Sequence, residues 1–303
     1  MTNHRICILG GTGFVGRHLV TRLAASGYRC RLPTRRPERH RDLSLVPGTE
    51  LRQSDIFEAG VLERQLEGCT AVINLVGILN EEGNRTFQRV HVDLVERILD
   101  AAQAVDITRY LHMSALHAQA TQGTSRYLRT KGRGEDLAHA RADMRVTSFR
   151  PSVIFGPGDG FFNRFATLLK ITPGVFPLAC PNARFAPVYV GDLVSAMTKA
   201  LTNPSCVGKG YDLCGPRIYS LKELIEYTAD VTDRRKIVIG LPDFGARLQA
   251  RVFQLLPGKP FTMDNYLSLR TDSVCGHDGL VELGIEPRAV EALVPSYLRR
   301  EAV

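Results

Sequence analysis

The sequence predicts an α/β protein in which a doubly wound parallel sheet carries a small C-terminal cap. Two observations predict the sheet: residues 6–16 hold an apolar run and a glycine-rich turn that leads into a helical pattern, and strand-like segments alternate with helical ones up to residue 155. A third observation predicts the cap, because the alternation loosens after residue 155 and Pro173, Pro177 and Pro181 interrupt it.

The glycine-rich turn has the spacing of a dinucleotide-binding fingerprint. The apolar run before it predicts a buried strand, and the helical pattern after it ends at Ser26-Gly27. An early glycine permits the turn, a middle one lets the backbone approach a pyrophosphate, and a late one lets the helix pack on the strand. A glycine turn without a ligand is the alternative. We expect a Rossmann fold with cofactor-binding residues Gly10, Gly11, Thr12, Gly13, Phe14, Val15 and Gly16.

Composition excludes several classes of protein. Charged residues make up 23% of the 303 residues and hydrophobic ones 44%, an ordinary globular balance. No apolar run reaches the roughly 18 residues of a membrane span, and no secretory signal is evident, so we expect a cytoplasmic location. The seven cysteines lack a C-x-x-C motif, which favours free thiols, and the eight histidines show no paired spacing, so no metal site is expected.

The net charge of +8 leaves several partners open. Nucleic acid, an anionic membrane or a phosphorylated cofactor could each use a basic surface. No nucleic-acid-binding motif accompanies the charge, so we expect no nucleic-acid partner and favour an ordinary solvated surface.

The end of the second strand, at residues 29–32, predicts the type of cofactor. An acidic residue normally binds the ribose hydroxyls of NAD here, but no Asp or Glu occurs between Gly10 and Pro37. A guanidinium can bind a 2′-phosphate that a carboxylate would repel, so we expect NADP(H) to be preferred, with NAD(H) as the alternative and Arg35 as the phosphate ligand. A solvated basic loop is the competing interpretation for Arg29, Arg31, Arg35, Arg36, Arg39 and Arg41.

The next two strands predict further cofactor contacts. After a weak strand at residues 50–52, Asp55 could accept from the adenine amino group, beside Ile56, or could cap a helix over residues 58–67. A clear buried strand at residues 71–77 places Val76 and Gly77 at its carboxyl end, where ligands bind in open α/β sheets.

The remaining pattern predicts how the chain is divided. Helices are expected at residues 85–104 and 127–142, and strands at 109–114 and 146–155. Ser220 and Glu223 have the spacing of a capping box for a helix that ends at Val231. We expect a dinucleotide-binding domain over residues 1–155, to which residues 185–215 return, and a smaller substrate-binding cap formed by residues 156–184 and 216–303.

Three polar residues form a candidate catalytic set. Tyr127 and Lys131 lie four apart on one helix face, and Ser114 ends the preceding strand. A nearby cation lowers the pKa of a tyrosine, which is near 10 in isolation, and so makes it a usable acid or base. Lysine can also bind the nicotinamide ribose, and serine can hold the substrate oxygen. We therefore assign Tyr127, Lys131 and Ser114 as catalytic, with the first two also contacting the cofactor.

With these residues the chain resembles the extended or atypical short-chain dehydrogenase/reductases over nearly its whole length. The resemblance rests on the glycine turn, Ser114, Tyr127 with Lys131, the stretch at residues 150–157, and Val188-Tyr189-Val190-Gly191-Asp192. The resemblance implies that Pro151 and Val153 contact the cofactor.

Within that family the chain most resembles the group of the nucleotide-carrying accessory subunit of respiratory complex I and its bacterial relatives. This narrower resemblance rests on the stretches at residues 74–79, 90–92, 185–190 and 211–216. His91 stands where many extended members have an asparagine that helps to place the lysine, which puts the proton relay in question. We favour a packing role for His91.

These observations leave different classes of function open. One is an NADP(H)-dependent oxidoreductase, or an epimerase or dehydratase, on a carbonyl, alcohol or sugar-like substrate. Another is a non-catalytic module that holds NADP(H) within a respiratory assembly, and a third is a membrane-surface helper of quinone chemistry. The resemblance leaves association with a membrane or respiratory complex open, and implies the mitochondrial matrix for a eukaryotic source. The sequence names no substrate.

Overall fold

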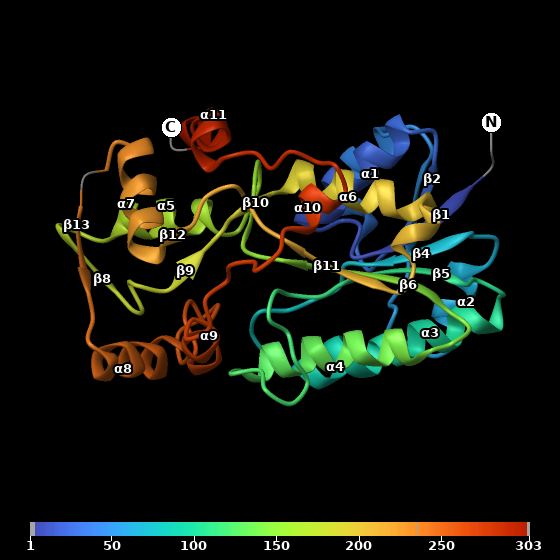
Figure 1. The fold of residues 1–303 in the computed structure, drawn as a ribbon, viewed down its shortest axis with the longest axis horizontal. Helices are drawn as coiled ribbons and strands as arrows, with labels where there is room; N and C mark the ends of the chain where they lie inside the picture. Colours follow the sequence, from blue (N-terminus) through green and yellow to red (C-terminus); the bar gives the residue numbers. More distant parts are fainter. Residues whose placement is uncertain (1–3, 235, 302–303) are drawn as a thin grey trace.

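The computed structural model describes residues 4–234 and 236–301, and its centre is a seven-stranded sheet (Figure 1). The strand order is β11-β6-β5-β4-β1-β2-β3, and every neighbouring pair is parallel. The predicted doubly wound parallel sheet is therefore confirmed. Its strands are β1 (Arg5–Leu9), β2 (Arg29–Thr34), β3 (Thr49–Gln53), β4 (Ala71–Asn74), β5 (Arg109–Met113), β6 (Arg145–Pro151) and β11 (Lys209–Leu213).

Helices cover both faces of the sheet, because its strands are apolar on both sides. In β1, Ile6 and Ile8 pack into one core and Cys7 and Leu9 into the other. The first face carries α1 (Phe14–Ala25), α6 (Val190–Thr202) and α10 (Gly279–Glu282). The second carries α2 (Val61–Leu66), the π-helical turn η2 (Arg89–Asp93), α3 (Leu94–Ala104) and α4 (Arg126–Ala140). Two short 3₁₀ segments are η1 (Pro37–Leu45) and η3 (Pro204–Cys206).

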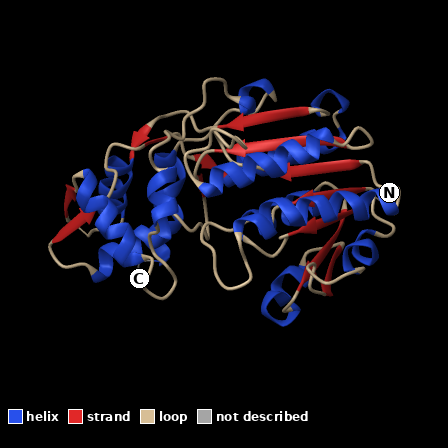
Figure 2. Ribbon diagram, turned by 90° about the horizontal axis from the view of Figure 1, so that it is seen from below, coloured by secondary structure: helices blue, strands red, loops and turns tan. Residues whose placement is uncertain are grey.

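A cap of short elements lies at one end of the sheet (Figure 2). Its strands form three two-stranded sheets, β10-β7, β12-β9 and β13-β8. The strands are β7 (Ile154–Phe155), β8 (Val175–Leu178), β9 (Arg184–Phe185), β10 (Val188–Tyr189), β12 (Tyr219–Ser220) and β13 (Ile237–Gly240). The helices are α5 (Phe162–Ile171), α7 (Leu221–Val231), α8 (Asp243–Phe253), α9 (Met263–Ser268) and α11 (Val290–Glu301).

Two buried carboxylates organise this end of the molecule: Asp192 ties the cap to the sheet domain, and Asp159 joins two helices within the cap. Asp192, at the start of α6, accepts from the backbone N–H and the guanidinium of Arg288 at 2.8 Å, and that guanidinium lies 4.3 Å from the Tyr189 ring centroid. Asp159 accepts at 2.7 Å from the backbone N–H of Phe162 at the start of α5, and at 2.5 Å from the hydroxyl of Tyr297.

Local structure departs from the sequence-based expectations at two helices. The helix expected at residues 58–67 begins only at Val61, after Gly60 in a left-handed conformation. Asp55 accepts from the N–H of Phe57 at 3.0 Å and does not cap that helix, so the capping interpretation is wrong. The helix expected at residues 85–104 begins as the π-helical turn η2. The capping box of Ser220 and Glu223 is confirmed.

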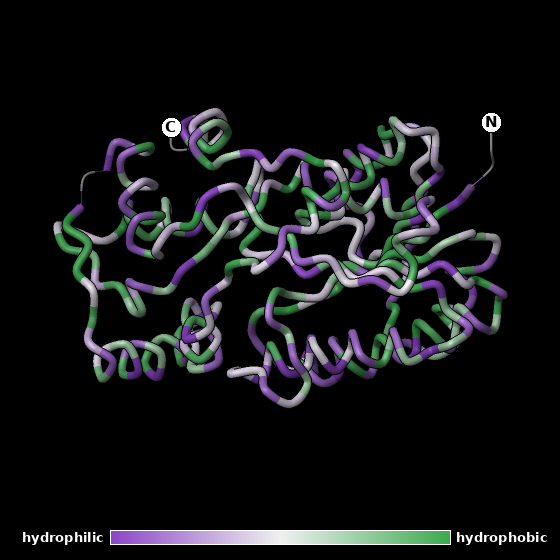
Figure 3. Tube along the Cα trace, viewed as in Figure 1, coloured by the Kyte–Doolittle hydropathy of each residue, from purple (hydrophilic) through white to green (hydrophobic). Residues whose placement is uncertain are grey.

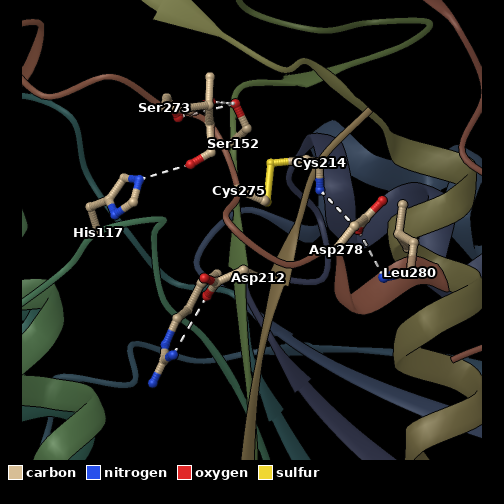
Figure 4. The surroundings of a disulfide bond; sticks show 10 residues. His117, Ser152, Asp212, Cys214, Ser273, Cys275, Asp278 and Leu280 are labelled. Carbon is tan, nitrogen blue, oxygen red and sulfur yellow. Dashed lines mark hydrogen bonds and ion pairs between the residues drawn. A yellow bond between two sulfur atoms is a disulfide. The ribbon is translucent and has the colours of Figure 1, made fainter. Parts of the chain in front are cut away.

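The expectation of free thiols is wrong for two cysteines. Cys214 at the end of β11 forms a disulfide with Cys275. Cys275 lies in the return segment, residues 272–278, which leads from the cap back to α10 (Figure 4). In the same segment Ser273 O accepts from the Ser152 hydroxyl at 2.7 Å, and Val274 O accepts from His117 Nε2 at 2.9 Å. Dispersed spacing could not indicate this pairing, because the fold brings together residues that are 61 apart in sequence.

The disulfide gives a prediction for stability. Replacing Cys275 by serine should lower the free energy of unfolding by about 4 kcal/mol, because the cross-link no longer restricts the unfolded chain. Urea unfolding without reductant measures the difference, and Cys180→Ser, at a half-buried free cysteine, is the control. Equal stability of Cys275→Ser and the oxidised parent would contradict the cross-link.

Candidate functional site

The glycine-rich turn joins β1 to α1 as the sequence predicts. Gly10 has a φ of +80°, and its carbonyl oxygen accepts from the N–H of Gly13 at 3.0 Å. A Cβ on Gly16 would lie 2.5 Å from the carbonyl carbon and oxygen of Gly11, so packing alone requires glycine there. Thr12, Phe14 and Val15 are half-buried around the turn.

Gly13 differs from Gly16, because the conformation and packing of the protein alone do not require glycine at position 13. Gly13 is exposed and has a φ of −78°, which any residue can adopt. A Cβ there would approach only the Gly10 carbonyl oxygen, at 3.3 Å. No side chain caps the N-terminus of α1, and its first turn contains no acidic residue. The turn is therefore an open backbone cradle beside the positive end of a helix, a geometry that fits a pyrophosphate.

The arginines near the end of β2 fall into two groups. Arg31 is 6% exposed, binds the Glu50 carboxylate and donates to backbone carbonyls near the end of α2. The interpretation that it belongs to a solvated loop is therefore wrong. Arg35 follows the last residue of β2 and is exposed. Within residues 4–234 and 236–301 its guanidinium makes no hydrogen bond or ion pair, which leaves it available to an anion.

The ends of β3 and β4 lie next to the glycine turn. Val76 and Ile56 pack at the edge of the core formed by Leu9 and its neighbours. A Cβ on Gly10 would come within 3.2 Å of the Val76 nitrogen, so the β4 loop lies directly against the turn. Asp55 is half-buried.

Lys131 projects from α4 to the end of β5, and the Tyr127 ring centroid lies 5.5 Å from that of His91. Lys131 is 5% exposed, and its ammonium donates to the carbonyl oxygen of Met113, the last residue of β5. Ser114 follows at once; its hydroxyl is buried and has no hydrogen-bond partner in the described part of the chain. A buried polar atom without a partner costs free energy, so its presence points to a ligand.

Electrostatics at this set differ from the expectation. Burial raises the pKa of Tyr127 to about 12, and the Asp264 carboxylate acts in the same direction. Burial lowers the pKa of Lys131 to about 8, which Glu135 partly opposes. The prediction that Lys131 lowers the pKa of Tyr127 is wrong for this structure, because burial dominates and the ammonium is bound to Met113.

His91 holds the β4 loop in place. It is 2% exposed, and its ring centroid lies 5.5 Å from that of Phe87 in a stacked arrangement. Its Nε2 accepts from the N–H of Ile78 at 3.1 Å, and its Nδ1 lies 3.0 Å from Thr130 Oγ1. Burial, with Lys131 in second place, lowers the pKa of His91 to about 2, so the ring is neutral and Nδ1–H donates to Thr130. The packing role is confirmed.

Pro151 and Val153 lie at the end of β6. The Pro151 carbonyl accepts from the N–H of Leu116 at 3.2 Å, and the Val153 carbonyl accepts from that of Val188 at 2.9 Å. The first bond holds the loops after β5 and β6 together at the edge of the sheet where β1 and β4 also end, and the second joins the loop after β6 to β10.

The sequence did not reveal Asp264, which lies on α9 in the cap. Its two carboxylate oxygens accept from the backbone N–H groups of Arg126 at 2.8 Å and of Tyr127 at 3.1 Å, and so cap the start of α4. No local signal could have identified it, because the capped helix begins 138 residues earlier.

The fold and this site define a class of protein. The chain matches the NAD dependent epimerase/dehydratase family over residues 6–214, and it belongs to that family. The match ends just after β11, the last strand to join the central sheet.

Individual relatives extend the comparison. The chain is 30% identical to the rat protein "NADH dehydrogenase [ubiquinone] 1 alpha subcomplex subunit 9, mitochondrial", over 97% of this chain and 79% of the relative. It is 31% identical to the ceramide reductase of Caulobacter vibrioides, over 79% of this chain and 74% of the relative.

Solved structures share the fold at low identity. MoeE5, in complex with UDP-glucose and NAD, has a TM-score of 0.75 and 18% identity over 99% of this chain and all of that one. The dTDP-glucose 4,6-dehydratase DesIV of Streptomyces venezuelae, as a double mutant with NAD and DAU bound, has a TM-score of 0.75 and 20% identity over 97% of this chain and 96% of that one.

The contact between α9 and α4 can be tested directly. Asp264→Ala should lower the free energy of unfolding by about 1–2 kcal/mol, because two backbone N–H groups lose their acceptors. Asp264→Asn keeps one acceptor oxygen and should lose less. Urea unfolding measures both, and amide hydrogen exchange at Arg126 and Tyr127 should accelerate in the alanine variant. Unchanged exchange at both amides would show that the cap does not hold this helix end.

Proposed function

We propose that this protein is an NADP(H)-dependent oxidoreductase that reduces a carbonyl group. The observation that carries the proposal is the buried, unpartnered hydroxyl of Ser114, next to the carbonyl that binds Lys131 and at the same edge of the sheet as the glycine cradle. The relative named as a ceramide reductase and the neighbours with bound NAD support this class of chemistry.

The cofactor assignment is supported by the open backbone at Gly13 and the uncapped start of α1, which suit the pyrophosphate. Arg35 supplies the cation for a 2′-phosphate, and Asp55 and Ile56 lie toward the adenine. Val76 and Gly77 follow β4 beside the glycine turn and Lys131, where the cofactor would pass, and Pro151 and Val153 would contact the nicotinamide. A nicotinamide dinucleotide, when bound, supplies the hydride.

Each catalytic residue has a separate task. Ser114 donates a hydrogen bond to the carbonyl oxygen of the substrate and orients it. The Tyr127 hydroxyl gives its proton to that oxygen as negative charge develops there. Lys131 binds the ribose hydroxyls of the cofactor. Thus the carbonyl carbon gains the hydride, the oxygen gains the proton, and an alcohol forms.

The protonation state of Tyr127 fits the role of a proton donor. With a pKa of about 12 the phenol is protonated at neutral pH, as an ordinary tyrosine is, and its raised pKa makes it a weaker acid. An epimerase or dehydratase on a sugar-like substrate would need the same residue to accept a proton first.

A second function has its own observation. Lys131 is held by the Met113 carbonyl, and the pKa of Tyr127 lies above its ordinary value, so the set favours tight nucleotide binding without turnover. The rat relative, named as a respiratory NADH dehydrogenase subunit, supports this alternative and an association with a respiratory complex or its membrane. Among the described residues no helix has the length and apolar character to cross a membrane. A cytoplasmic location, or the mitochondrial matrix for a eukaryotic source, stays a prediction.

The cofactor preference can be measured by calorimetric titration with NADPH and NADH. Arg35→Ala should remove about 1.5–3 kcal/mol of binding free energy from NADPH, which is the range for a hydrogen bond to a charged group. The same change should remove little binding free energy from NADH, which lacks the 2′-phosphate. Arg39→Ala, another exposed arginine after β2, is the matched control and should change neither. Tighter binding of NADH by the parent protein would overturn the preference.

The role of Tyr127 distinguishes an enzyme from a holder of cofactor. Tyr127→Phe keeps the ring and removes the hydroxyl that supplies the proton. The kcat should therefore fall about 10²–10⁴-fold, while NADPH affinity stays within a few-fold of that of the parent. NADPH oxidation with a panel of long-chain and sugar-like carbonyl compounds is the readout. Full turnover by Tyr127→Phe on any substrate would refute the mechanism, whereas tight nucleotide binding with no substrate in the panel would favour the second function.

A further inference from the structure

Helix α8 carries an apolar stripe that faces away from the protein. Phe244, Leu248 and Val252 follow one another at intervals of four residues, which places them on one side of the helix. Their exposed fractions are 77%, 51% and 48%, and Leu255, just past the end of the helix, is 82% exposed. Apolar residues at this spacing normally face a core, so the stripe is the side of α8 that lacks a partner.

The opposite side of α8 is anchored by its smallest residues. Ala246 and Ala250 are buried and pack with Tyr266 of α9 and with Ala179. The helix therefore buries methyl groups against the cap and exposes a phenyl ring and branched aliphatic side chains. This distribution is the reverse of the one that would favour a free, solvated surface helix.

The apolar surface continues onto the neighbouring small sheet. Val238 of β13 is buried, whereas Ile237 and Ile239 on its other face are exposed, and so is Val175, the register partner of Ile237 in β8. Gln249 of α8 donates to the Pro177 carbonyl of β8 at 3.2 Å, which joins the helix to this sheet. Figure 3 shows the hydrophobic colouring along β8 and β13 and its alternation with hydrophilic colouring along α8, at the outer end of the cap.

We call this the α8 surface and define it by Val175, Ile237, Ile239, Phe244, Leu248, Val252 and Leu255. Of the thirteen large apolar side chains that are exposed in the described part of the chain, seven lie between residues 237 and 256. Scattered exposed apolar residues are normal, whereas a concentration of them in one segment of the chain indicates a site of interaction.

The segment that carries the α8 surface has a net positive charge. Residues 236–260 contain four basic residues and one acidic residue, and Lys259 among them donates to the Glu81 carbonyl. At 100° per residue, Arg251 and Arg247 follow the stripe on one side of α8, and both are exposed. Arg247 is engaged within the protein, because it forms an ion pair at 2.9 Å with Asp243 and its guanidinium lies 5.8 Å from the Tyr266 ring centroid. Arg251 is therefore the arginine of α8 that is available to an anion.

We propose that the α8 surface binds the surface of an anionic phospholipid bilayer. Phe244, Leu248 and Val252 enter the acyl region just below the headgroups, and Arg251 contacts lipid phosphates. At 11 residues, α8 is about 16 Å long, far too short to span a bilayer, so it lies in the plane of the interface. This binding does not depend on the chemistry at Tyr127 and holds for either function proposed above.

The test is co-sedimentation of the full chain with vesicles. One set contains phosphatidylcholine alone, and the other an equimolar mixture of phosphatidylcholine and phosphatidylglycerol. The parent protein should bind the anionic vesicles more tightly than the neutral ones, and salt should weaken that binding. The triple variant Phe244→Ser, Leu248→Ser, Val252→Ser should bind at least about tenfold more weakly, because three apolar side chains no longer enter the membrane. Arg251→Glu should reduce the preference for anionic vesicles.

Matched controls lie elsewhere on the surface. Leu45 in η1 and Val281 in α10 are exposed apolar residues outside the α8 surface, and changing both to serine should leave vesicle binding unchanged. Thermal unfolding of each variant checks the fold, and the single variant Phe244→Ser serves if the triple variant is destabilised.

Three outcomes would overturn the proposal. One is equal vesicle binding by the parent and the folded triple or single variant. Another is equal binding to neutral and anionic vesicles. The third is a parent protein that binds no vesicles and instead forms a dimer, which the serine substitutions abolish. That result would assign the α8 surface to a second copy of this chain.

Discussion

The close crossing of α4 over the π-helical turn η2 is the constraint on which the site depends. A Cβ on Gly134 would lie 2.0 Å from the carbonyl oxygen of His91, so only glycine lets the two segments approach this closely. Because α4 lies so near, Thr130 reaches His91, and Lys131 reaches the end of β5. His91 in turn fixes the N–H of Ile78 and with it the loop after β4. A π-helical turn at this position widens the helix where the contact forms, as such turns often do near functional sites.

The sequence predicted those parts of the fold that depend on local pattern. The strand, glycine turn and helix at residues 5–25 follow from apolar runs and glycine spacing, and the capping box at Ser220 follows from two residues three apart. Contacts between distant segments carry no such signal. Asp264 reaches α4 from the cap, and Cys275 reaches Cys214 from the return segment; neither residue has a neighbour in sequence that would indicate its partner.

The candidate site shows the same division. Tyr127, Lys131 and Ser114 were identified from type and spacing, and the fold brings the ammonium of Lys131 to the residue before Ser114. Their electrostatics were not predictable, because a pKa depends on burial and on charges that only the folded chain assembles. Likewise Arg31 and Arg35 are four residues apart in one basic run. Arg31 is buried and donates to backbone carbonyls, whereas Arg35 is exposed and has no partner among the described residues. Strand alternation and loop position, not composition, separate them.

Asp264 makes the acidity of Tyr127 a property that the cap and the sheet domain share. Its carboxylate holds the N–H of Tyr127 and also raises the pKa of the phenol. Any movement of α9 away from α4 removes a negative charge from the neighbourhood of that phenol and makes it a stronger acid. Thermodynamic linkage requires the reverse effect as well: ionisation of Tyr127 favours a cap that has moved away. Burial is the larger cause of the raised pKa of Tyr127, and the contact of α9 with α4 adds to it through the charge of Asp264.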